Sequence, residues 1–348
     1  MRRRIRREKS FLVRAVHDPK LFVYRARRTV SPRTAFLELN HDPSRTLLLV
    51  GSGRSGTTWL AEIYADALAG RLVFEPLRSQ SVPWTWPVRF GHFIDPDRDT
   101  DPAVAKVVDR ILTGRVRTRF TDRYNKVRFA RCRVVKEVRA TNLLPWIARH
   151  YPRTPVVYLL RHPVPTAWSV SELGWSGNLE KFLDQPSLMD GPFRPFRPLI
   201  AEAAASADVF HRVVLQWCLE NFVPTQLLDP RQAHVVFYEE MVDDPRGELE
   251  RLQTYLRGFG SHRWELRGGS ATGVTRPSGT NYRGTDVTSG SRRLDQWVDE
   301  IPAGRVERAL TLMRGFGLDR IYDSSTRPVI PAGGVLLGGR TAPPSVAL

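Results

Sequence analysis

The segment TLLLVGSGRSGTTWL, residues 46–60, carries the strongest fold signal in this chain. Residues 46–50 are an apolar run between turn signals, which is the pattern of a buried parallel strand. Three glycines follow at positions 51, 53 and 56, and residues 57–68 then suit a helix. A strand, a glycine-rich turn and a helix start form a phosphate cradle, because the free N–H groups of the first helical turn point at the anion.

The spacing from Gly51 to Gly56 is that of the P-loop of nucleotide hydrolases, but the next residue differs. A P-loop has a lysine after its second glycine, where it reaches the β- and γ-phosphates. This chain has Thr57 there, while Arg54 supplies a positive charge inside the turn and Thr58 adds a second hydroxyl. The loop therefore predicts phosphate binding, but not the binding and hydrolysis of a magnesium nucleoside triphosphate.

Composition places the chain among globular proteins. Its 348 residues are 41% hydrophobic, which suits one large α/β domain or two small ones. No apolar run approaches the ~20 residues needed to span a bilayer. Two cysteines, Cys132 and Cys218, are too few for a disulfide framework. We therefore expect free buried thiols and a reducing, cytoplasmic location. The protein could still be peripheral to a membrane there, through the basic arm described in the next paragraph.

The net charge of +17 is unevenly distributed along the chain. Residues 1–33 contain twelve Arg or Lys against Glu8 and Asp18, with apolar residues between them. We expect a basic N-terminal arm over residues 1–34, a domain over 35–323 and a Pro/Gly-rich tail over 324–348. The arm is either a solvated tail or an attachment to an anionic membrane surface.

Four more segments have the apolar composition of buried strands. They are residues 71–76, 133–139, 155–160 and 233–238. Helical patterns lie over residues 102–113, 141–150, 201–228, 246–256 and 303–316. We expect a break or kink at Pro145 and a surface loop over 182–198. Alternating strands and helices predict a P-loop-like α/β fold with three layers, in which helices flank a central parallel sheet.

Polar residues stand at the ends of these expected strands. Glu75 ends the second strand, Lys136 lies near the end of the third, and Arg161 and Tyr238 follow the last two. Because the carboxyl ends of parallel strands meet at one edge of a sheet, we expect these side chains to surround the phosphate loop.

The loop Arg54–Leu60, RSGTTWL, resembles the 5′-phosphosulfate loop of sulfotransferases, which use 3′-phosphoadenosine-5′-phosphosulfate (PAPS) and no metal. Two further motifs are similar to those of carbohydrate sulfotransferases: Glu75-Pro76-Leu77, and VKEVR at Val135–Arg139. The cytosolic class that sulfates phenols and steroids has a histidine base where this chain has Val138. The resemblance implies transfer to a sugar hydroxyl of a glycan or glycolipid, and a small-molecule acceptor remains open.

The same resemblance implies a nucleotide site. In the family an arginine at a strand end and a serine eight residues later bind the 3′-phosphate, and Arg161 and Ser169 have that spacing. The family has Asp or Asn next to this arginine, where the chain has His162. The implied nucleotide-binding set is Arg54, Ser55, Gly56, Thr57, Thr58, Trp59, Arg161, Ser169 and Tyr238, the last near the adenine. Candidates in a segment that closes over the nucleotide are Arg276, Ser278, Arg283 and Arg292.

Sulfuryl transfer needs an anion cradle, a cation for the developing charge and a base. We expect Lys136 and Arg54 to stabilise the transferring group and Glu75 to be the base. Glu137 is the second candidate for the base and His162 the third.

Two other functions remain open. A P-loop kinase would bind Mg-ATP, although the loop lysine and an obvious Mg-binding aspartate at a strand end are missing from the sequence. A non-catalytic protein that binds polyanions or membranes would show no PAPS binding and a steep salt dependence. No motif indicates a specific nucleic-acid partner.

Overall fold

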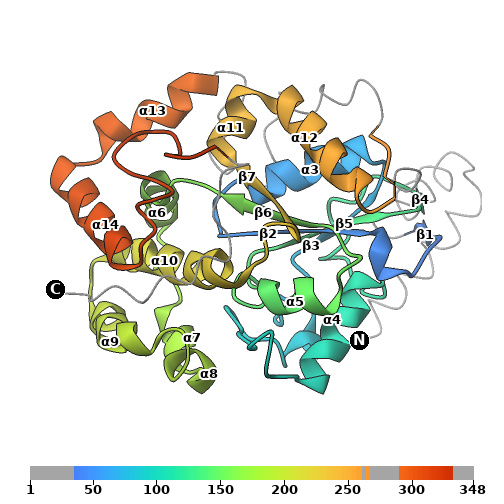
Figure 1. Ribbon diagram of the computed structural model, residues 1–348, viewed down its shortest axis with the longest axis horizontal. Helices are drawn as coiled ribbons and strands as arrows, with labels where there is room; N and C mark the ends of the chain where they lie inside the picture. The colour runs from blue at the N-terminus through green and yellow to red at the C-terminus, as the bar shows by residue number, and fades with distance from the viewer. Residues whose placement is uncertain (1–34, 261–263, 267–289, 332–348) are drawn as a thin grey trace, which may run out of the picture.

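A computed structural model describes residues 35–260, 264–266 and 290–331 of the chain. A five-stranded parallel sheet lies at its centre, in the order β3-β5-β2-β6-β7 (Figure 1). The strands are β2 (Thr46–Gly51), β3 (Arg71–Phe74), β5 (Arg133–Glu137), β6 (Val156–Leu160) and β7 (Ala233–Phe237). The phosphate-loop strand β2 is therefore the middle strand, as a P-loop-like α/β fold requires.

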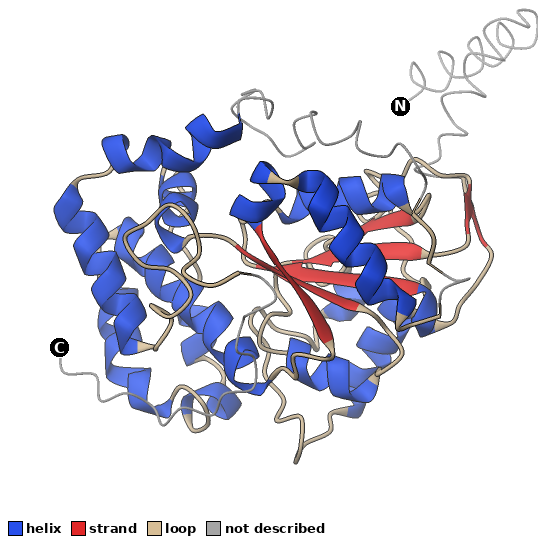
Figure 2. Ribbon diagram, turned by 45° about the horizontal axis from the view of Figure 1, so that its top comes forward, coloured by secondary structure: helices blue, strands red, loops and turns tan. Residues whose placement is uncertain are grey.

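Helices cover both faces of this sheet (Figures 1 and 2). Leu47 and Leu49 of β2 pack into one apolar cluster with α3 (Thr57–Ala67) and α12 (Pro245–Arg257). Leu48 and Val50, which point to the opposite face because side chains alternate along a strand, pack into a second cluster. The second cluster includes α4 (Pro102–Leu112), α5 (Leu144–His150), α6 (Pro163–Ser171), α10 (Val209–Leu227) and α14 (Ala303–Gly315). The expected three layers are confirmed.

Shorter elements complete the described chain. A small parallel pair consists of β1 (Leu37–Glu38) and β4 (Phe129–Ala130). The remaining elements are η1 (Pro43–Arg45), η2 (Pro83–Thr85), α7 (Leu179–Leu183), α8 (Pro186–Met189), η3 (Arg194–Phe196), α9 (Arg197–Ala205), α11 (Tyr238–Asp243) and α13 (Gly290–Glu300). None of the described helices is both long and apolar enough to cross a membrane.

Three strands end earlier than the sequence predicts: β7 stops one residue early, at Phe237, and β3 and β5 each stop two residues early. β3 stops at Phe74, and Glu75 takes a left-handed backbone with φ of 41°. β5 stops at Glu137, whose carboxylate accepts the backbone N–H groups of Val138 at 2.8 Å and Arg139 at 3.0 Å. The same carboxylate accepts the Leu77 N–H at 2.7 Å, so it joins the chain after β3 to the chain after β5.

The prediction of a surface loop over residues 182–198 is wrong. Helix α7 ends in this range, α8 and η3 lie within it and α9 begins there, while Phe182, Phe193 and Phe196 are fully buried. Phe196 stacks on Phe316 at 4.0 Å between ring centroids, a contact far along the chain. Three of the four prolines in this range stand in the first turns of α8, η3 and α9, where their missing N–H is tolerated.

The single helix expected over residues 201–228 is two helices. α9 ends at Ala205, and Asp208 caps α10 by accepting the His211 N–H at 3.3 Å. Pro145 stands in the first turn of α5, so it begins that helix instead of kinking it. Both differences follow from capping chemistry that a hydrophobic pattern does not contain.

The outer segments are described only in part. The basic arm, residues 1–34, lies outside the described residues. Of the tail, residues 324–331 are described: Arg327 pairs with Asp243 at 2.8 Å and the Val329 N–H donates to the Ile321 carbonyl at 2.8 Å. The start of the tail therefore packs on the domain. Both cysteines are buried thiols outside any disulfide, as expected.

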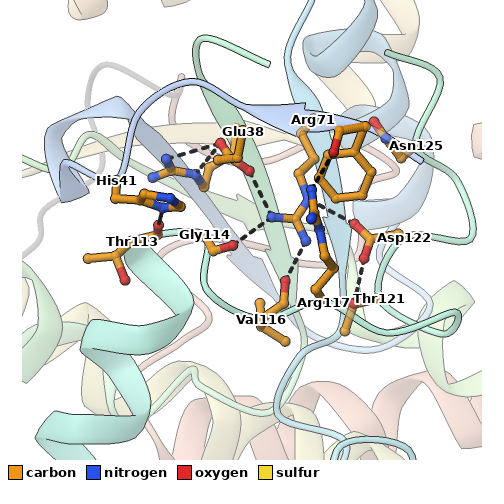
Figure 3. Close-up of polar contacts among 12 residues, drawn as sticks. Glu38, His41, Arg71, Thr113, Gly114, Val116, Arg117, Thr121, Asp122 and Asn125 are labelled. Carbon is orange, nitrogen blue, oxygen red and sulfur yellow. Dashed lines mark hydrogen bonds and ion pairs between the residues drawn. The ribbon is translucent and has the colours of Figure 1, made fainter. Parts of the chain in front are cut away.

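A buried ion-pair cluster lies at the amino ends of β3 and β5 (Figure 3). Arg71, fully buried, contacts Glu38 and Asp122, each at 2.8 Å. Its guanidinium also donates to the Gly114 carbonyl at 2.8 Å and to the Val116 carbonyl. Arg133 pairs with Glu38 at 3.1 Å and is equally buried. This cluster anchors the loop over residues 114–122 and the β1 segment under the sheet.

Candidate active site

A cleft of about 950 Å³ opens at the carboxyl ends of the strands. It collects nearly every residue that the sequence predicts for the site. The predicted residues in its lining are Arg54, Gly56, Thr57, Thr58, Trp59, Glu75, Lys136, Arg161, Ser169 and Tyr238. Ser55 is the exception: its hydroxyl donates to the Ser52 carbonyl at 2.6 Å, so its side chain shapes the loop from behind.

The loop between β2 and α3 has the geometry of an anion cradle. α3 begins at Thr57, directly after Gly56, and no side chain caps its first N–H groups. These groups and the Thr57 and Thr58 hydroxyls are donors for an anion at the helix start. Arg54 has a left-handed backbone with φ of 66°, a strained conformation for a non-glycine residue that is concentrated at functional sites.

Gly56 is required for two reasons. Its φ of 93° is a conformation that L side chains rarely adopt, and a Cβ there would lie 2.6 Å from the Tyr238 ring. Tyr238 is the first residue of α11, directly after β7, and its ring meets Trp59 edge-on at 5.9 Å between centroids. The loop, β7 and α3 thus meet around one tyrosine, beside the cradle.

The predicted 3′-phosphate residues lie together next to Tyr238. Arg161 donates to the Arg54 carbonyl at 2.9 Å, and its guanidinium carbon lies 4.3 Å from the Tyr238 ring centroid. The Arg54 Nε in turn donates to the Ser169 hydroxyl at 3.2 Å. Arg54 therefore extends toward the β6 side of the cleft, and its expected role at the transferring group stays a prediction.

Glu75, Lys136 and Arg139 form the opposite wall, at the ends of β3 and β5. The Glu75 carboxylate contacts Lys136 at 2.6 Å and Arg139 at 2.9 Å. Burial alone would raise the pKa of Glu75, but these two cations outweigh burial and lower the pKa to about 2. With its left-handed backbone, Glu75 is an ionised, strained carboxylate that is 15% exposed, toward the cleft.

The other two candidates for the base do not line the cleft. Glu137 is 1% exposed and binds the backbone N–H groups described above. His162 is fully buried, accepts the Val164 N–H at 3.2 Å, lies 3.0 Å from the Asp323 carbonyl and stacks on Trp297. Burial lowers the pKa of His162 to about 4. In this geometry protein groups already engage both side chains, and their candidacy for the base stays a prediction.

The cleft contains polar residues that sequence reasoning missed. Three exposed cations, Arg78, Arg123 and Lys181, stand near the Glu75 wall, and Glu220 lines the cleft from α10. The three cations come from irregular segments or a short helix, where no periodicity marks a site. Glu220 had one available signal, because Gln216 and Glu220 are polar at i and i+4 in a helix that is otherwise largely apolar.

Several buried donors that line the cleft have no acceptor among the described residues. They are the Arg161 Nε and the indole N–H groups of Trp59, Trp217 and Trp297. Buried donors are ordinarily paired. These four atoms have almost no accessible surface, so a ligand in the cleft would reach them only after local rearrangement. The candidates Arg276, Ser278 and Arg283 for a closing segment lie outside the described residues, as does the side chain of Arg292.

Comparison with known proteins identifies one family. Residues 47–258, more than half of the chain, match the model described as Sulfotransferase family. No curated protein matches. Among solved structures, the sulfotransferase domain of the Synechococcus PCC 7002 olefin synthase is 14% identical, with TM-score 0.41, covering 80% of this chain and 96% of that domain.

A second solved structure, the sulfotransferase domain from the curacin biosynthetic pathway, is similar at 15% identity with TM-score 0.36. That likeness covers 77% of this chain and 97% of that domain. At these low TM-scores the two likenesses do not define the substrate of this chain.

Proposed function

The chain belongs to the sulfotransferase family, and we propose that it transfers the sulfuryl group of PAPS to the hydroxyl of an acceptor. The observation that carries this proposal is the common cleft. The uncapped anion loop, the Arg161–Ser169 pair and the Glu75–Lys136 pair all line it, although they come from four different strand ends. These are the parts that sulfuryl transfer needs: a cradle, a charge clamp and a base.

PAPS fits the donors that line the cleft. Its 5′-phosphosulfate would bind the N–H groups at the start of α3 and the Thr57 and Thr58 hydroxyls. Its 3′-phosphate would bind Ser169 and Arg161, which both line the cleft. Tyr238 and Trp59, beside the loop, supply aromatic surface for the adenine. The cleft is also large enough for a nucleotide together with an acceptor.

The strand order places the two groups of cleft residues on opposite sides of the β2 loop. Arg161 follows β6 and Tyr238 follows β7, on one side of the β2 loop, while Lys136 and Glu75 stand at β5 and β3 on the other side. Neighbouring strands are about 4.8 Å apart, so the two sides are each one to two strand spacings from the loop. We therefore propose that the nucleotide occupies the β6–β7 side and the acceptor the β5–β3 side, with sulfur between them above β2.

Glu75 and Lys136 then have separate roles. The acceptor oxygen attacks sulfur in line, a new O–S bond forms, and the bond between sulfur and the bridging phosphate oxygen breaks. Lys136 offsets the charge that develops on the transferring group, and Glu75 takes the acceptor proton. A carboxylate with a lowered pKa is a weak base, so it accepts this proton late, as the attacking oxygen becomes acidic. 3′,5′-Adenosine bisphosphate (PAP) leaves with the electron pair of the broken bond.

For the acceptor we propose a sugar hydroxyl of a glycan or glycolipid. The β5–β3 side combines the polar residues Gln80 and Lys181 with the aromatic ring of Phe90, and Trp175 stands at the cleft with half of its surface exposed. Aromatic faces and hydrogen-bonding side chains together suit a sugar ring. A hydroxylated small molecule is the alternative acceptor.

Titration calorimetry with PAP, with and without Mg²⁺, tests the proposal, together with sulfuryl transfer from PAPS to a panel of glycans. We expect PAP to bind equally in both conditions and Mg-ATP to bind poorly, since the loop lysine of a P-loop is Thr57 here. Mg-dependent ATP binding without PAP binding would support the kinase alternative. Failure to bind either nucleotide would leave the polyanion-binding alternative.

We also propose that the chain works in the cytoplasm, where residues 1–33 attach it to an anionic membrane surface. The support is their charge, since each basic residue near such a surface contributes about 1 kcal/mol. The full-length protein should sediment with phosphatidylserine vesicles at moderate salt. A chain that lacks residues 1–33 should remain in solution and keep its PAP affinity. A full-length protein that ignores the vesicles would contradict this attachment.

A further inference from the structure

Glu220 is an acid in a cleft built for an anion. It lies on α10, is 2% exposed and lines the cleft opposite the β5 wall. Glu75 in the same cleft contacts two cations, whereas no ion pair of Glu220 is found among the described residues. A buried carboxylate without a cation is costly, so its presence beside the phosphate loop requires an explanation.

A directed chain of hydrogen bonds ends on this carboxyl group. The Tyr158 hydroxyl donates to the Asn221 Oδ1 at 2.5 Å, and the Asn221 Nδ2 donates to the Ser52 hydroxyl at 3.1 Å. Ser52 then has its own proton free to donate to Glu220, with which it is hydrogen-bonded. Gln216 donates to Glu220 at 2.7 Å from the preceding helical turn. The carboxyl group is thus oriented from two elements.

Of the groups that act on Glu220, one is a cation and the others are neutral. Ser52 after β2, Gln216 on α10 and Tyr158 on β6 are neutral groups. Arg139 after β5 is the nearest cation that acts on it, and Arg139 already contacts Glu75 and Glu137. Burial therefore dominates and raises the pKa of Glu220 to about 7, although hydrogen bonds from Ser52 and Gln216 oppose the shift.

We propose that Glu220 takes up a proton when the nucleotide enters the cleft, so that donor binding is coupled to protonation of this residue. The inference rests on the proposed function, because it requires a nucleotide with several negative charges at the adjoining loop. Such a ligand repels the ionised carboxylate and is compatible with the neutral acid, which is itself a hydrogen-bond donor. By linkage, the proton and the nucleotide each strengthen the binding of the other.

This coupling has a defined sign. At a pH well below 7 the free protein already holds the proton, so nucleotide binding takes up none. At higher pH the carboxylate must first be protonated, and PAP affinity falls by up to about tenfold per pH unit. The phosphates of PAP titrate near pH 6 themselves. Their contribution is removed by comparison with the isosteric variant Glu220→Gln, which is neutral at every pH.

Calorimetry of PAP binding at pH 8, in buffers of different ionisation enthalpy, measures the number of protons taken up. We expect uptake by the wild type, no uptake by Glu220→Gln, and tighter PAP binding by Glu220→Gln than by the wild type at pH 8 to 9. The matched control is Glu300→Gln, which removes an exposed carboxylate from the rim of the same cleft. This control should take up protons as the wild type does.

Equal proton uptake by the wild type and by folded Glu220→Gln would overturn the inference. A folded wild type that does not bind PAP would instead overturn the proposed function. If Glu220→Gln fails to fold, infrared difference spectra of the wild type decide at the same pH. PAP should produce the C=O band of a protonated carboxylic acid, and its absence would overturn the inference.

Discussion

The strands β3 and β5 carry ion pairs at both ends, and the two ends differ in function. At the amino ends, Arg71 and Arg133 are fully buried against Glu38, with Asp122 on the far side of Arg71 (Figure 3). At the carboxyl ends, Lys136 and Glu75 form a closer pair, 2.6 Å, beside the cleft. The chemistry of the pairs is the same, so it cannot by itself distinguish an anchor from a site.

The two ends of β3 and β5 differ in how many hydrogen-bond donors are occupied and in how much of each charged side chain is exposed. Carbonyl groups of the surrounding loops occupy two further donors of Arg71, and no surface of its side chain is accessible. Glu75 is 15% exposed and Arg139 is 21% exposed, both toward the cleft, and the backbone of Glu75 is strained. A charged pair with unused capacity, held in a costly conformation, is available to a ligand. A saturated pair stabilises the fold instead.

The largest effect should come from Glu75→Gln. The variant keeps the size of the side chain and removes the proposed base, so turnover should fall by about 10²–10⁴-fold. Initial rates of sulfuryl transfer measure the loss of turnover. PAP affinity, measured separately, should be nearly unchanged. Glu137→Gln is the matched variant and should reduce turnover less. Near-wild-type turnover in Glu75→Gln, with a collapse in Glu137→Gln, would transfer the role to Glu137.

Arg71→Met tests the opposite end of the same strand. It leaves the Glu38 and Asp122 carboxylates buried without their cation, so the free energy of unfolding should fall by about 3–5 kcal/mol. Urea denaturation measures this loss. Arg139→Met, at the cleft end, should cost less stability because water reaches its partners. If the two variants lost equal stability, saturation would not be the difference between the two ends.

Arg161→Ala should have a smaller effect, confined to the nucleotide. Removal of a hydrogen bond to a charged group should weaken PAP binding by about 1.5–3 kcal/mol. Calorimetry on the folded variant measures it, with the exposed Arg153→Ala as the control that leaves affinity unchanged. An unaltered PAP affinity in Arg161→Ala would remove this residue from the nucleotide site.

A strong chelator should have the smallest effect. Lys136 and the α3 N-terminus are proposed to supply the charge compensation that a metal ion supplies in kinases. Turnover with PAPS should therefore survive EDTA, in the same assay that follows Glu75→Gln. Loss of activity that only Mg²⁺ restores would show that the cleft cations are insufficient.

Most of the secondary structure around the site can be predicted from local sequence patterns. The elements that were not predicted show what those patterns leave out. The parallel strands and helices α3, α4, α12 and α14 are each expected from the sequence to within a few residues. The helices of residues 179–205 are not, because their prolines mark first turns and their phenylalanines pack on Phe222 and Phe316 from distant segments. The sequence of this segment has the composition of a loop, although the segment folds into buried helices.

The sequence by itself determined the phosphate loop, the order of the strands along the chain and the family, because these depend on short-range order: glycines beside a strand, and polar residues near the point where apolar runs stop. It also predicted which residues would meet, since parallel strands share one carboxyl edge. Only the tertiary structure decided their environments. Glu75, Glu137 and Glu220 are the same residue type, but they are surrounded by two cations, by three backbone N–H groups and by neutral hydrogen-bond donors respectively. Such surroundings are assembled from segments far apart in the chain, so no local pattern contains them.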